Sequence, residues 1–350
     1  MKTARPVASD QLGFGFEEPN PAPVSPAKPP AKKISPAASS PRTPSSDTAA
    51  DGSAEAMART LEAHPDYRVL RRLVPRLVFP AATGPVATLL VLDTETTGMD
   101  SAQDRVIELG MVVFEFDPVS GTVVRVVDVF DELEDPGFAI PPATIAIHHI
   151  TDDMVSGRQI DDAAVARLLK DVAVVIAHNA AFDRPFVEQR WPVFADMDWA
   201  CSVKDIPWRE EGFGSAKLEF LLHANGFFHE AHRAEADCRA LLELLSRHLP
   251  ERQQPALLPL LETLNQPQYR VYATGSPFET KDMLKARGYR WSAEIRCWSR
   301  VVAGEEARAE ELTWLKRRVY AGRPAHVEVE PLGARVRYSQ RSGHKEAVAL

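Results

Sequence analysis

Three apolar, β-rich runs in the middle of the chain limit its fold more than any other feature. They are ATLLVLDTETTG at 87–98, RVIELGMVVFEF at 105–116 and VVRVVDVFDEL at 123–133, and turn residues separate them. Segments with helical periodicity follow, interrupted by the apolar run AVVIAH at 173–178, which is typical of a buried strand. We therefore expect residues 87–250 to form an α/β domain with a mixed sheet flanked by helices.

The helices of this domain are expected where apolar residues recur with helical spacing. Gly226 and Pro250 mark the ends of the last two helices, since each residue type interrupts a helix. The expected helices fall within residues 144–155, 163–171, 182–191, 216–226 and 236–249.

The chain before this domain has a different composition. Residues 1–55 contain 10 of the 28 prolines, set among Ala, Ser and Lys. Such a segment cannot bury enough apolar surface to offset the entropy lost on ordering, so we expect a disordered tail. Residues 56–86 show apolar residues at helical spacing broken by Pro65 and Pro75, which predicts a lead-in of two short helices.

A second, smaller unit is expected after a linker at residues 251–267. Residues 268–340 show the order strand, helix, strand, helix, strand, and ARVRYS at 334–339 suggests a last strand. This order predicts a small α+β accessory domain.

The composition limits the class of protein. The chain has 350 residues, of which 45% are hydrophobic and 26% charged, and no apolar run approaches the roughly 18 residues of a membrane span. The first residues lack the apolar stretch of a secretory signal. Cys201, Cys238 and Cys297 provide neither a disulfide framework nor zinc-ligand spacing. These features predict a cytoplasmic protein that does not enter membranes.

The net charge of −8 is unevenly distributed along the chain. Residues 51–267 carry 19 Lys and Arg against 35 Asp and Glu, whereas residues 268–350 carry 16 against 10. A basic segment beside an acidic middle suits a polyanionic partner held next to a carboxylate-rich metal site. The alternative is that the basic side chains only keep the second domain solvated.

Paired carboxylates are the strongest chemical signal in the sequence. Asp93 and Glu95 follow the apolar run LLVL, and residues two apart on a strand point to the same face. A lone pair of this kind is more commonly a turn that ends a strand. Here Asp183 lies just past a second strand, where α/β proteins build sites, and His232 and Asp237 follow in HRAEAD. The ordered set favours a shared metal site.

The spacing of His232 and Asp237 indicates how they lie. Five residues turn through about 500° along a helix, so the two side chains cannot share one helix face. We expect His232 on the loop that leads into the helix carrying Asp237. Four carboxylates brought together require divalent cations to offset their repulsion, and oxygen ligands favour Mg²⁺ or Mn²⁺ over zinc.

Six motifs within residues 87–250 occur in the order of a known family. They are DTETTG, IELG, IHHITDDMV, AHNAAFD, LEFLLHANG and HRAEADC. With these motifs the domain resembles the DnaQ-like DEDDh 3′-to-5′ exonucleases, the family of the proofreading subunit of bacterial DNA polymerase III. A sister group has tyrosine at the position of Arg233, so the histidine class is indicated. His149 stands where the family often has glycine.

The resemblance implies an RNase H-like fold and a role for each central residue. Metal ligation is carried over to Asp93, Glu95, Asp183 and Asp237, and the role of general base to His232. The implied cofactor is a pair of Mg²⁺ ions, for which Mn²⁺ can substitute, and these ions orient the attacking water and stabilise the leaving 3′ oxygen. A histidine with an ordinary pKa of about 6.5 can accept the water's proton at neutral pH.

Four further residues are candidates for holding the terminal nucleotide. They are Thr96, Thr97, Asn179 and Phe182. Structural packing and helix capping are an equally good explanation for these residues.

The expected function is a metal-dependent 3′-to-5′ exonuclease that acts on single-stranded or frayed DNA 3′ ends in repair or proofreading and releases nucleoside monophosphates. The same chemistry on RNA stays open, because nothing in the sequence specifies recognition of the 2′-hydroxyl. A catalytically idle nucleic-acid-binding module is the rival from another class. The five intact central residues argue against that rival, since binding alone does not need all of them. No polymerase region accompanies the domain, so proofreading requires a partner protein.

The flanking segments carry two weaker signals. Lys281, Gly288, Trp291 and Trp298 resemble the pattern of a small domain of unknown function. Arginines alternate there with aromatic residues, which fits either a stacking and phosphate-binding platform or a core with a solvated surface. In the tail, Gln11, Leu12, Phe14 and Phe16 are similar in spacing to the short peptides by which bacterial replication proteins bind the sliding clamp.

Overall fold

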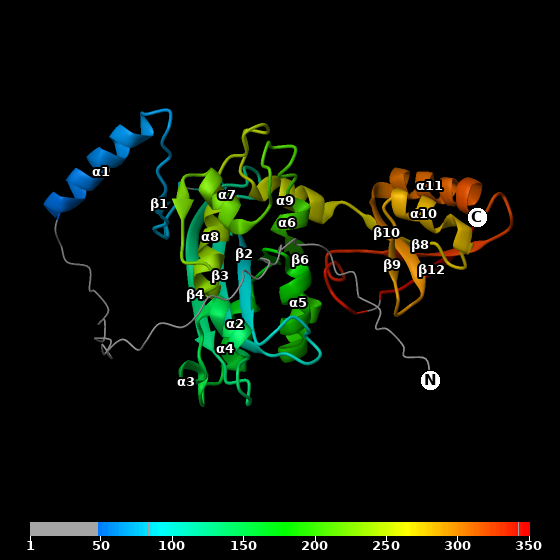
Figure 1. Cartoon of the computed structure of the whole chain (residues 1–350), viewed down its shortest axis with the longest axis horizontal. Coiled ribbons are helices and arrows are strands. Elements are labelled where there is room, and N and C mark those ends of the chain that lie inside the picture. Colours follow the sequence, from blue (N-terminus) through cyan, green and yellow to red (C-terminus); the bar gives the residue numbers. More distant parts are fainter. Residues whose placement is uncertain (1–47, 81, 83, 342) are drawn as a thin grey trace, which may run out of the picture. The chain divides into compact units, whose positions relative to one another are not determined.

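The computed structural model describes residues 48–350 except residues 81, 83 and 342 (Figure 1). The chain divides into two units, residues 1–56 and 57–350, and the second contains both five-stranded sheets described below. The predicted disordered tail, with Gln11, Leu12, Phe14 and Phe16, lies outside the described residues up to residue 47. Its last predicted residues belong instead to helix α1 (Thr48–Glu62), whose Ala, Glu, Met and Leu residues are good helix formers.

The lead-in contains one helix and one short strand where two helices were predicted. After α1, strand β1 (Arg71–Arg72) pairs in parallel with β7 (Phe227–Phe228). The amide of Arg71 donates to the carbonyl of Gly226 at 2.9 Å, and that of Leu73 donates to the carbonyl of Phe228 at 2.8 Å. These long-range bonds take the amides that a second helix would have used, and the local helical spacing cannot reveal them.

A mixed five-stranded sheet forms the centre of the α/β domain (Figure 1). Its order is β4-β3-β2-β5-β6, with antiparallel pairing from β2 to β4 and parallel pairing of β5 to β2 and of β6 to β5. The strands are β2 (Ala87–Thr96), β3 (Val106–Phe116), β4 (Val123–Leu133), β5 (Val174–Ala177) and β6 (Asp198–Cys201). This arrangement confirms the predicted RNase H-like sheet. Strand β6 was not predicted, because its residues DWAC lack the continuous β-branched apolar run that marks β5.

Helices cover both faces of this sheet. Alternate residues of β2 face opposite cores: Leu89 and Val91 lie in one, Leu90 and Leu92 in the other. The first core includes residues of α7 (Leu218–Ala224), α8 (Ala234–Ser246) and α9 (Leu257–Asn265), and the second includes residues of α4 (Asp162–Leu169) and α5 (Ala180–Arg190). The helices are α2 (Pro142–His148), α3 (Asp152–Val155), α4 (Asp162–Leu169), α5 (Ala180–Arg190), η1 (Pro192–Asp196), α6 (Ser202–Asp205), α7 (Leu218–Ala224), α8 (Ala234–Ser246) and α9 (Leu257–Asn265).

Helix α9 corrects the expectation of a plain linker at residues 251–267. Leu257 and Leu260 are fully buried in the first core. The hydroxyl of Thr263 donates to the carbonyl of Asp205 at 2.9 Å. This segment is therefore part of the α/β domain, and its apolar residues pack on the domain that precedes it.

The C-terminal domain is an antiparallel sheet of order β12-β11-β8-β10-β9, with α10 and α11 on one face. Leu284 and Leu315 pack there against Val271 and Val302. Its elements are β8 (Gln268–Tyr272), η2 (Phe278–Thr280), α10 (Lys281–Ala286), β9 (Arg290–Ser292), β10 (Cys297–Ala303), α11 (Gly304–Trp314), η3 (Leu315–Val319), β11 (His326–Pro331) and β12 (Glu346–Ala349). The α+β class is confirmed, although the sheet extends past the predicted end at residue 340.

The segment Leu332–Arg341, which we call the strap, is not the strand predicted at 334–339. The guanidinium of Arg184 donates to the carbonyls of Ala334, Arg335 and Arg337 at 3.3, 2.6 and 2.5 Å. The amide of Trp199 also donates to the Ala334 carbonyl, at 3.1 Å. The strap therefore binds the α/β domain with the carbonyls that a sheet ladder would need.

No helix of the described residues is long and apolar enough to cross a membrane.

Candidate active site

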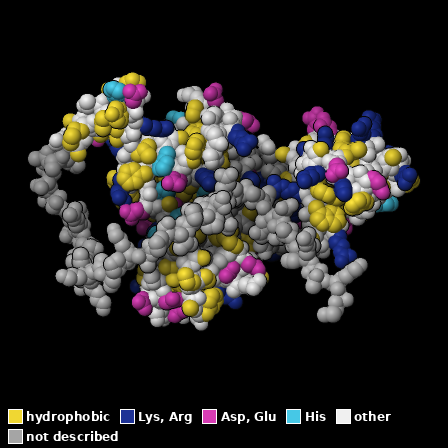
Figure 2. Space-filling view, in the orientation of Figure 1, with side chains coloured by type: hydrophobic (Ala, Val, Ile, Leu, Met, Phe, Trp, Pro, Cys, Tyr) yellow, Lys and Arg dark blue, Asp and Glu magenta, His cyan; other side chains and the backbone are white. Residues whose placement is uncertain are grey.

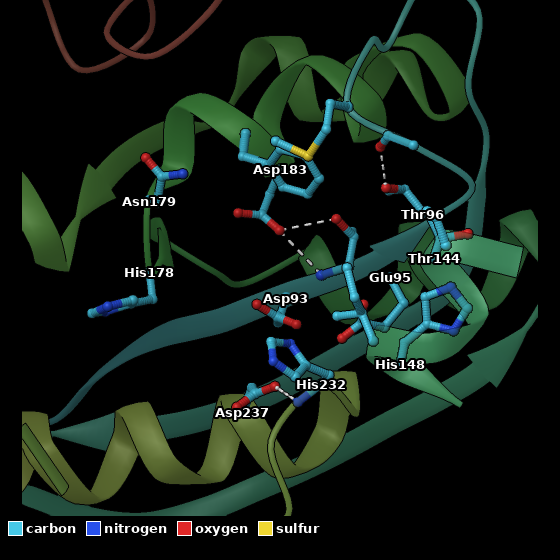
Figure 3. A pocket seen from close by; sticks show the side chains of 16 residues that line it. Asp93, Glu95, Thr96, Thr144, His148, His178, Asn179, Asp183, His232 and Asp237 are labelled. Carbon is cyan, nitrogen blue, oxygen red and sulfur yellow. Dashed lines mark hydrogen bonds between the residues drawn. The ribbon is translucent and has the colours of Figure 1, made fainter. Parts of the chain in front are cut away.

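A pocket of about 390 Å³ opens beside the end of β2, lined by residues that the sequence analysis singled out (Figure 3). Asp93, Glu95 and Asp237 each offer a carboxylate oxygen, and these oxygens lie within 4.8 Å of one another. The first two come from β2 and the third from α8, 142 residues further along the chain than Glu95. Three oxygen ligands this close suit a hard divalent cation.

A glycine on β3 allows α8 to reach this position. Gly110 lies opposite Asp93 in the β2–β3 ladder. A Cβ atom on Gly110 would lie 2.4 Å from the carbonyl carbon of Ala234, the first residue of α8. The Cys238 thiol also lies 3.3 Å from the Gly110 carbonyl. Only glycine leaves room for α8 to bring Asp237 this close to β2.

Asp183 approaches from the opposite side of the pocket, on the first turn of α5 (Figure 3). Its Oδ1 accepts hydrogen bonds from the amide and hydroxyl of Thr94 at 3.1 and 2.9 Å. Asp183 is 2% exposed and does not belong to the close group of three carboxylates. The Thr94 bonds leave its second oxygen, Oδ2, available to the pocket.

Asp237 is held by groups on the loop before α8. The Nε2 atom of His229 lies 2.5 Å from Asp237 Oδ1. The amide of His232 donates to Asp237 Oδ2 at 2.8 Å. Both carboxylate oxygens are thus oriented by the chain, and His229 is a positioning residue that the sequence analysis did not identify.

His232 lies outside α8, as the spacing argument predicted. It adopts a left-handed backbone with φ of 63°, and its exposed side chain lines the pocket beside the carboxylates (Figure 3). The neighbouring Arg233 donates to Glu108 Oε1 from Nε at 2.9 Å and from Nη2 at 2.6 Å. Glu108, which is 1% exposed, also accepts from the amide of Ala234 at 2.9 Å. This buried carboxylate fixes the start of α8 and the loop that presents His232.

Burial and mutual repulsion shift the titration of the acidic groups. Burial, together with the nearby carboxylates of Asp237 and Glu108, raises the pKa of Glu95 to about 8. Burial likewise raises the pKa of Asp183 to about 7. The pKa of Asp93 is raised well above its ordinary range, first by burial and then by Asp183 and Asp237. A bound cation would stabilise the ionised forms, so the donor set fits a divalent metal.

His148 contributes a donor that the sequence analysis missed. It is 2% exposed, and its Nδ1 accepts a hydrogen bond from the amide of Ile150 at 3.0 Å. The hydrogen of the neutral ring therefore lies on Nε2, which has no protein partner although the residue lines the pocket. His149, where glycine is common in the resembling family, has φ of 59° and caps α2. This cap turns the chain and helps to place His148.

His178 lies on the pocket wall after β5 (Figure 3). Its Nδ1 is 2.8 Å from the hydroxyl of Ser202. Burial lowers its pKa to about 4, so the ring is neutral at pH 7. His178 can therefore form hydrogen bonds without adding a permanent charge to the site.

The structure separates the four candidate nucleotide-binding residues. Thr96, Asn179 and Phe182 line the pocket, whereas Thr97 does not. The Thr97 hydroxyl donates to Asp104 at 3.2 Å and accepts from the amide of Arg105 at 3.0 Å. Thr97 therefore stabilises the loop that follows β2. This is the structural role that the sequence analysis gave as the alternative to nucleotide binding.

Five functional neighbours were missed, and four of them lie in motifs noted in the sequence. Glu108 and Gly110 belong to IELG, His148 to IHHIT and His178 to AHN, while His229 comes just before HRAEAD. Local periodicity gave no reason to select them, since their partners lie far away in the sequence.

The chain is similar in sequence to a known exonuclease family and to parts of DNA polymerases. The family described as Exonuclease matches residues 90–245. DNA polymerase III subunit epsilon of Treponema pallidum is 35% identical over 164 residues, covering 44% of this chain and 73% of that protein. PolC-type DNA polymerase III of Lacticaseibacillus paracasei is 37% identical over 116 residues, covering 32% of this chain but only 8% of that protein. Exonuclease X, solved with 5′-overhanging duplex DNA, is 26% identical with a TM-score of 0.34, covering 49% of this chain and 99% of that one.

The fold and the pocket define a DnaQ-like exonuclease domain. The chain belongs to the exonuclease family, which confirms the class predicted from the six motifs. The PolC-type polymerases are much longer than this chain, which spans only 6–12% of the length of three of them.

Proposed function

We propose that this protein hydrolyses DNA from the 3′ end and releases nucleoside monophosphates. The observation that carries the proposal is the convergence of Asp93, Glu95 and Asp237 in one pocket, with Asp183 and His232 on its walls. The two curated relatives are a PolC-type DNA polymerase III and a subunit of DNA polymerase III, which favours DNA over RNA as the substrate and repair or proofreading as the process.

The proposed cofactor is a pair of Mg²⁺ ions, with Mn²⁺ as a substitute. Asp93, Glu95, Asp183 and Asp237 would hold these ions, which supply Lewis-acid activation of the water and of the scissile phosphate. The raised pKa values of Asp93, Glu95 and Asp183 support this assignment, because buried neighbouring carboxylates gain most from a cation.

The protein's own groups would supply positioning and proton transfer. His232 would accept the proton of the attacking water on a ring nitrogen, since its exposed side chain borders the carboxylates. The Glu108–Arg233 ion pair would hold the His232 loop during this step. The Nε2–H group of His148 would donate to an oxygen of the terminal nucleotide, and Thr96, Asn179 and Phe182 would contact its sugar and base.

Hydrolysis of labelled oligonucleotides tests the proposal directly. We expect 5′-labelled single-stranded DNA to shorten stepwise with Mg²⁺ or Mn²⁺, to release mononucleotides, and to remain intact in EDTA. Duplex DNA and RNA of the same sequence are run in parallel. A preference for RNA would replace the DNA proposal, and binding without hydrolysis would favour the idle-module alternative.

Two variants assign the central roles. Asp237→Ala should reduce hydrolysis to background, because it removes a metal ligand. His232→Ala should slow turnover by about 10² to 10⁴ with little loss of DNA binding, which is the range for losing a general base. A weaker affinity with unchanged turnover would instead make His232 a substrate-positioning residue.

The proposal includes a cytoplasmic location, where the free thiols of Cys201, Cys238 and Cys297 would stay reduced. It also includes a sliding clamp as partner, through Gln11, Leu12, Phe14 and Phe16. A flexible tether of this kind would raise the enzyme's concentration at DNA ends. A peptide of residues 8–20 should bind purified clamp, and the peptide with Gln11→Ala and Phe16→Ala should not. Failure of the natural peptide at high micromolar concentration would exclude the clamp as partner.

A further inference from the structure

A second pocket, of about 640 Å³, lies between the α/β domain, the strap and the C-terminal sheet. Its lining includes five basic residues: Lys204 of α6, Arg270 of β8, Arg290 of β9, Arg300 of β10 and Arg337 of the strap. We call it the basic groove.

At two places, residues close together along the chain line the basic groove and the active-site pocket. Ala181, on the first turn of α5, lines the groove, while its neighbours Phe182 and Asp183 line the active site. Lys204 lies two residues after Ser202, whose hydroxyl contacts His178 of the active site at 2.8 Å. A bound chain that leaves the carboxylates past α5 would therefore enter the groove.

The groove uses the face of the C-terminal sheet that its helices leave open. In the β-ladders Arg290 lies opposite Ser299, and Arg270 lies opposite Val301. Directly opposite residues share a face, and all four line the groove. The other face carries Val271 and Val302, which pack under α10 and α11. This face is exposed at Arg290 and Val301, whereas Tyr272 and Glu330 on the same face are buried.

The basic side chains of the groove are not equally available. Arg270 pairs with Glu330 at 3.0 Å and Arg300 with Glu311 at 2.8 Å. Arg337 is 3% exposed and donates to the carbonyls of Leu332, Thr263 and Gln266.

Lys204 and Arg290 are exposed. Neither forms an ion pair with another residue that the structure describes. The lining also contains Asp205, whose Oδ1 accepts from the hydroxyl of Tyr338 and Oδ2 from the amide of Cys201. Elsewhere on the C-terminal domain basic and acidic side chains are mixed (Figure 2). Lys204 and Arg290 are therefore the charges available to an anionic ligand.

We propose that the basic groove binds the phosphate backbone of the substrate strand upstream of the 3′ end held in the active site. This inference rests on the proposed function for the direction of the strand. Lys204 and Arg290 contact phosphates, while Arg270 and Arg300 are fixed by their carboxylate partners and shape the wall. The C-terminal domain thereby becomes part of the substrate-binding surface, and its basic excess of 16 Lys and Arg over 10 Asp and Glu in residues 268–350 acquires a role.

The test compares the full chain with Lys204→Ala/Arg290→Ala and with Lys285→Ala/Arg317→Ala. The control pair lies on α10 and η3, is exposed, and removes the same charge from the other face. Binding of 5′-fluorescein oligo(dT) of increasing length is measured in EDTA between 50 and 300 mM salt.

The salt slope is the fall of the logarithm of the binding constant with the logarithm of the salt concentration. We expect this slope to be smaller by about 1.4 in the groove variant, because each of two lost phosphate contacts accounts for about 0.7. Its affinity for long oligomers at about 0.1 M salt should fall by about 10- to 30-fold. The control variant should keep the natural slope and affinity. Equal slopes for all three proteins, or an equal fall for groove and control variants, would overturn the proposal.

A small substrate separates this proposal from the proposed function. The p-nitrophenyl ester of thymidine 5′-monophosphate occupies only the active site, so its Mn²⁺-dependent hydrolysis should be the same in all three proteins. A loss of ester hydrolysis in the groove variant would place Lys204 or Arg290 in the catalytic pocket and overturn the groove assignment. No ester or DNA hydrolysis by the natural protein would contradict the proposed function, while the salt slopes would still decide whether the groove binds DNA.

Discussion

Asp93, Glu95 and Asp183 make the stability of the metal-free protein depend on pH. Their pKa values are raised above the ordinary range of about 4, to about 8 for Glu95 and about 7 for Asp183, chiefly because the groups are buried. Between pH 4 and pH 8 the folded protein then binds more protons than the unfolded chain. The free energy of unfolding therefore falls as pH rises through this window.

The first prediction is that Asp93→Asn stabilises the metal-free protein at pH 8 and flattens this pH dependence. The amide cannot ionise, so it removes the repulsion between Asp93 and the carboxylates of Asp183 and Asp237. In EDTA the melting temperature should rise by about 2 to 4 °C for each kcal/mol gained in the free energy of unfolding. DNA hydrolysis should fall to background. Asp153→Asn, on the exposed surface of α3, is the control and should change neither property.

The second prediction concerns the free donor of His148. His148→Asn keeps an oxygen that can accept from the Ile150 amide but removes the Nε2–H group. We expect kcat/KM for DNA to fall by about 10- to 100-fold, the equivalent of one hydrogen bond to a charged group. Separate measurement of kcat and KM shows whether the bond forms in the bound substrate or in the transition state.

His149→Asn is the matched control, since asparagine tolerates the left-handed backbone at this exposed position. Normal kinetics for His148→Asn, with normal melting, would show that Nε2 does not contact the substrate.

At the level of elements, the contact of α8 with β3 decides whether the site is assembled. Gly110→Ala would place a Cβ atom 2.4 Å from the backbone of Ala234. Backbone cannot yield as a flexible side chain can, so the helix must move, at a cost of about 1–3 kcal/mol.

The third prediction is that Gly110→Ala reduces kcat by about 10²-fold while the protein stays folded, since a displacement of about 1 Å has this effect on catalytic groups. Gly333→Ala, where an added Cβ meets nothing within 4 Å, is the control. Steady-state kinetics and circular dichroism check both variants. Full activity in Gly110→Ala would mean that α8 does not need this close approach.

At the scale of the whole molecule, one buried arginine links the α/β domain to the strap. Arg184 is fully buried, pairs with Glu188 at 2.6 Å and donates to three strap carbonyls. Burial lowers the pKa of this guanidinium, although Glu188 opposes that effect.

The fourth prediction is that Arg184→Ala destabilises the protein by about 3 kcal/mol, the range for removing one member of a buried ion pair. The strap should become sensitive to limited proteolysis. Arg341→Ala, which removes a 47% exposed partner of the same Glu188, should cost about 1 kcal/mol or less. Equal stability of both variants would show that the strap is held by other contacts.

The sequence by itself determined the elements and the chemistry of the central site. The apolar runs of β2 to β5 predicted the sheet because side chains alternate between two cores along each strand. Asp93 and Glu95 could be paired because residues two apart on a strand point to the same face. His232 could be placed on a loop because residues five apart on a helix do not share a face. These inferences needed only short-range geometry. The exonuclease class came from the resemblance of the six motifs, and the family comparison confirms it.

Only the tertiary structure decided the contacts between distant residues. The Glu108–Arg233 pair joins residues 125 apart, and the Arg184–Arg337 bond joins residues 153 apart. The amides of Arg71 and Leu73 donate to residues 226 and 228 and not to carbonyls of a helix. The strap carbonyls likewise accept from Arg184 and not from a neighbouring strand. Those two predictions were therefore wrong. Local periodicity reports how a segment can fold, but the hydrogen bonds that a segment makes depend on which distant backbone lies beside it.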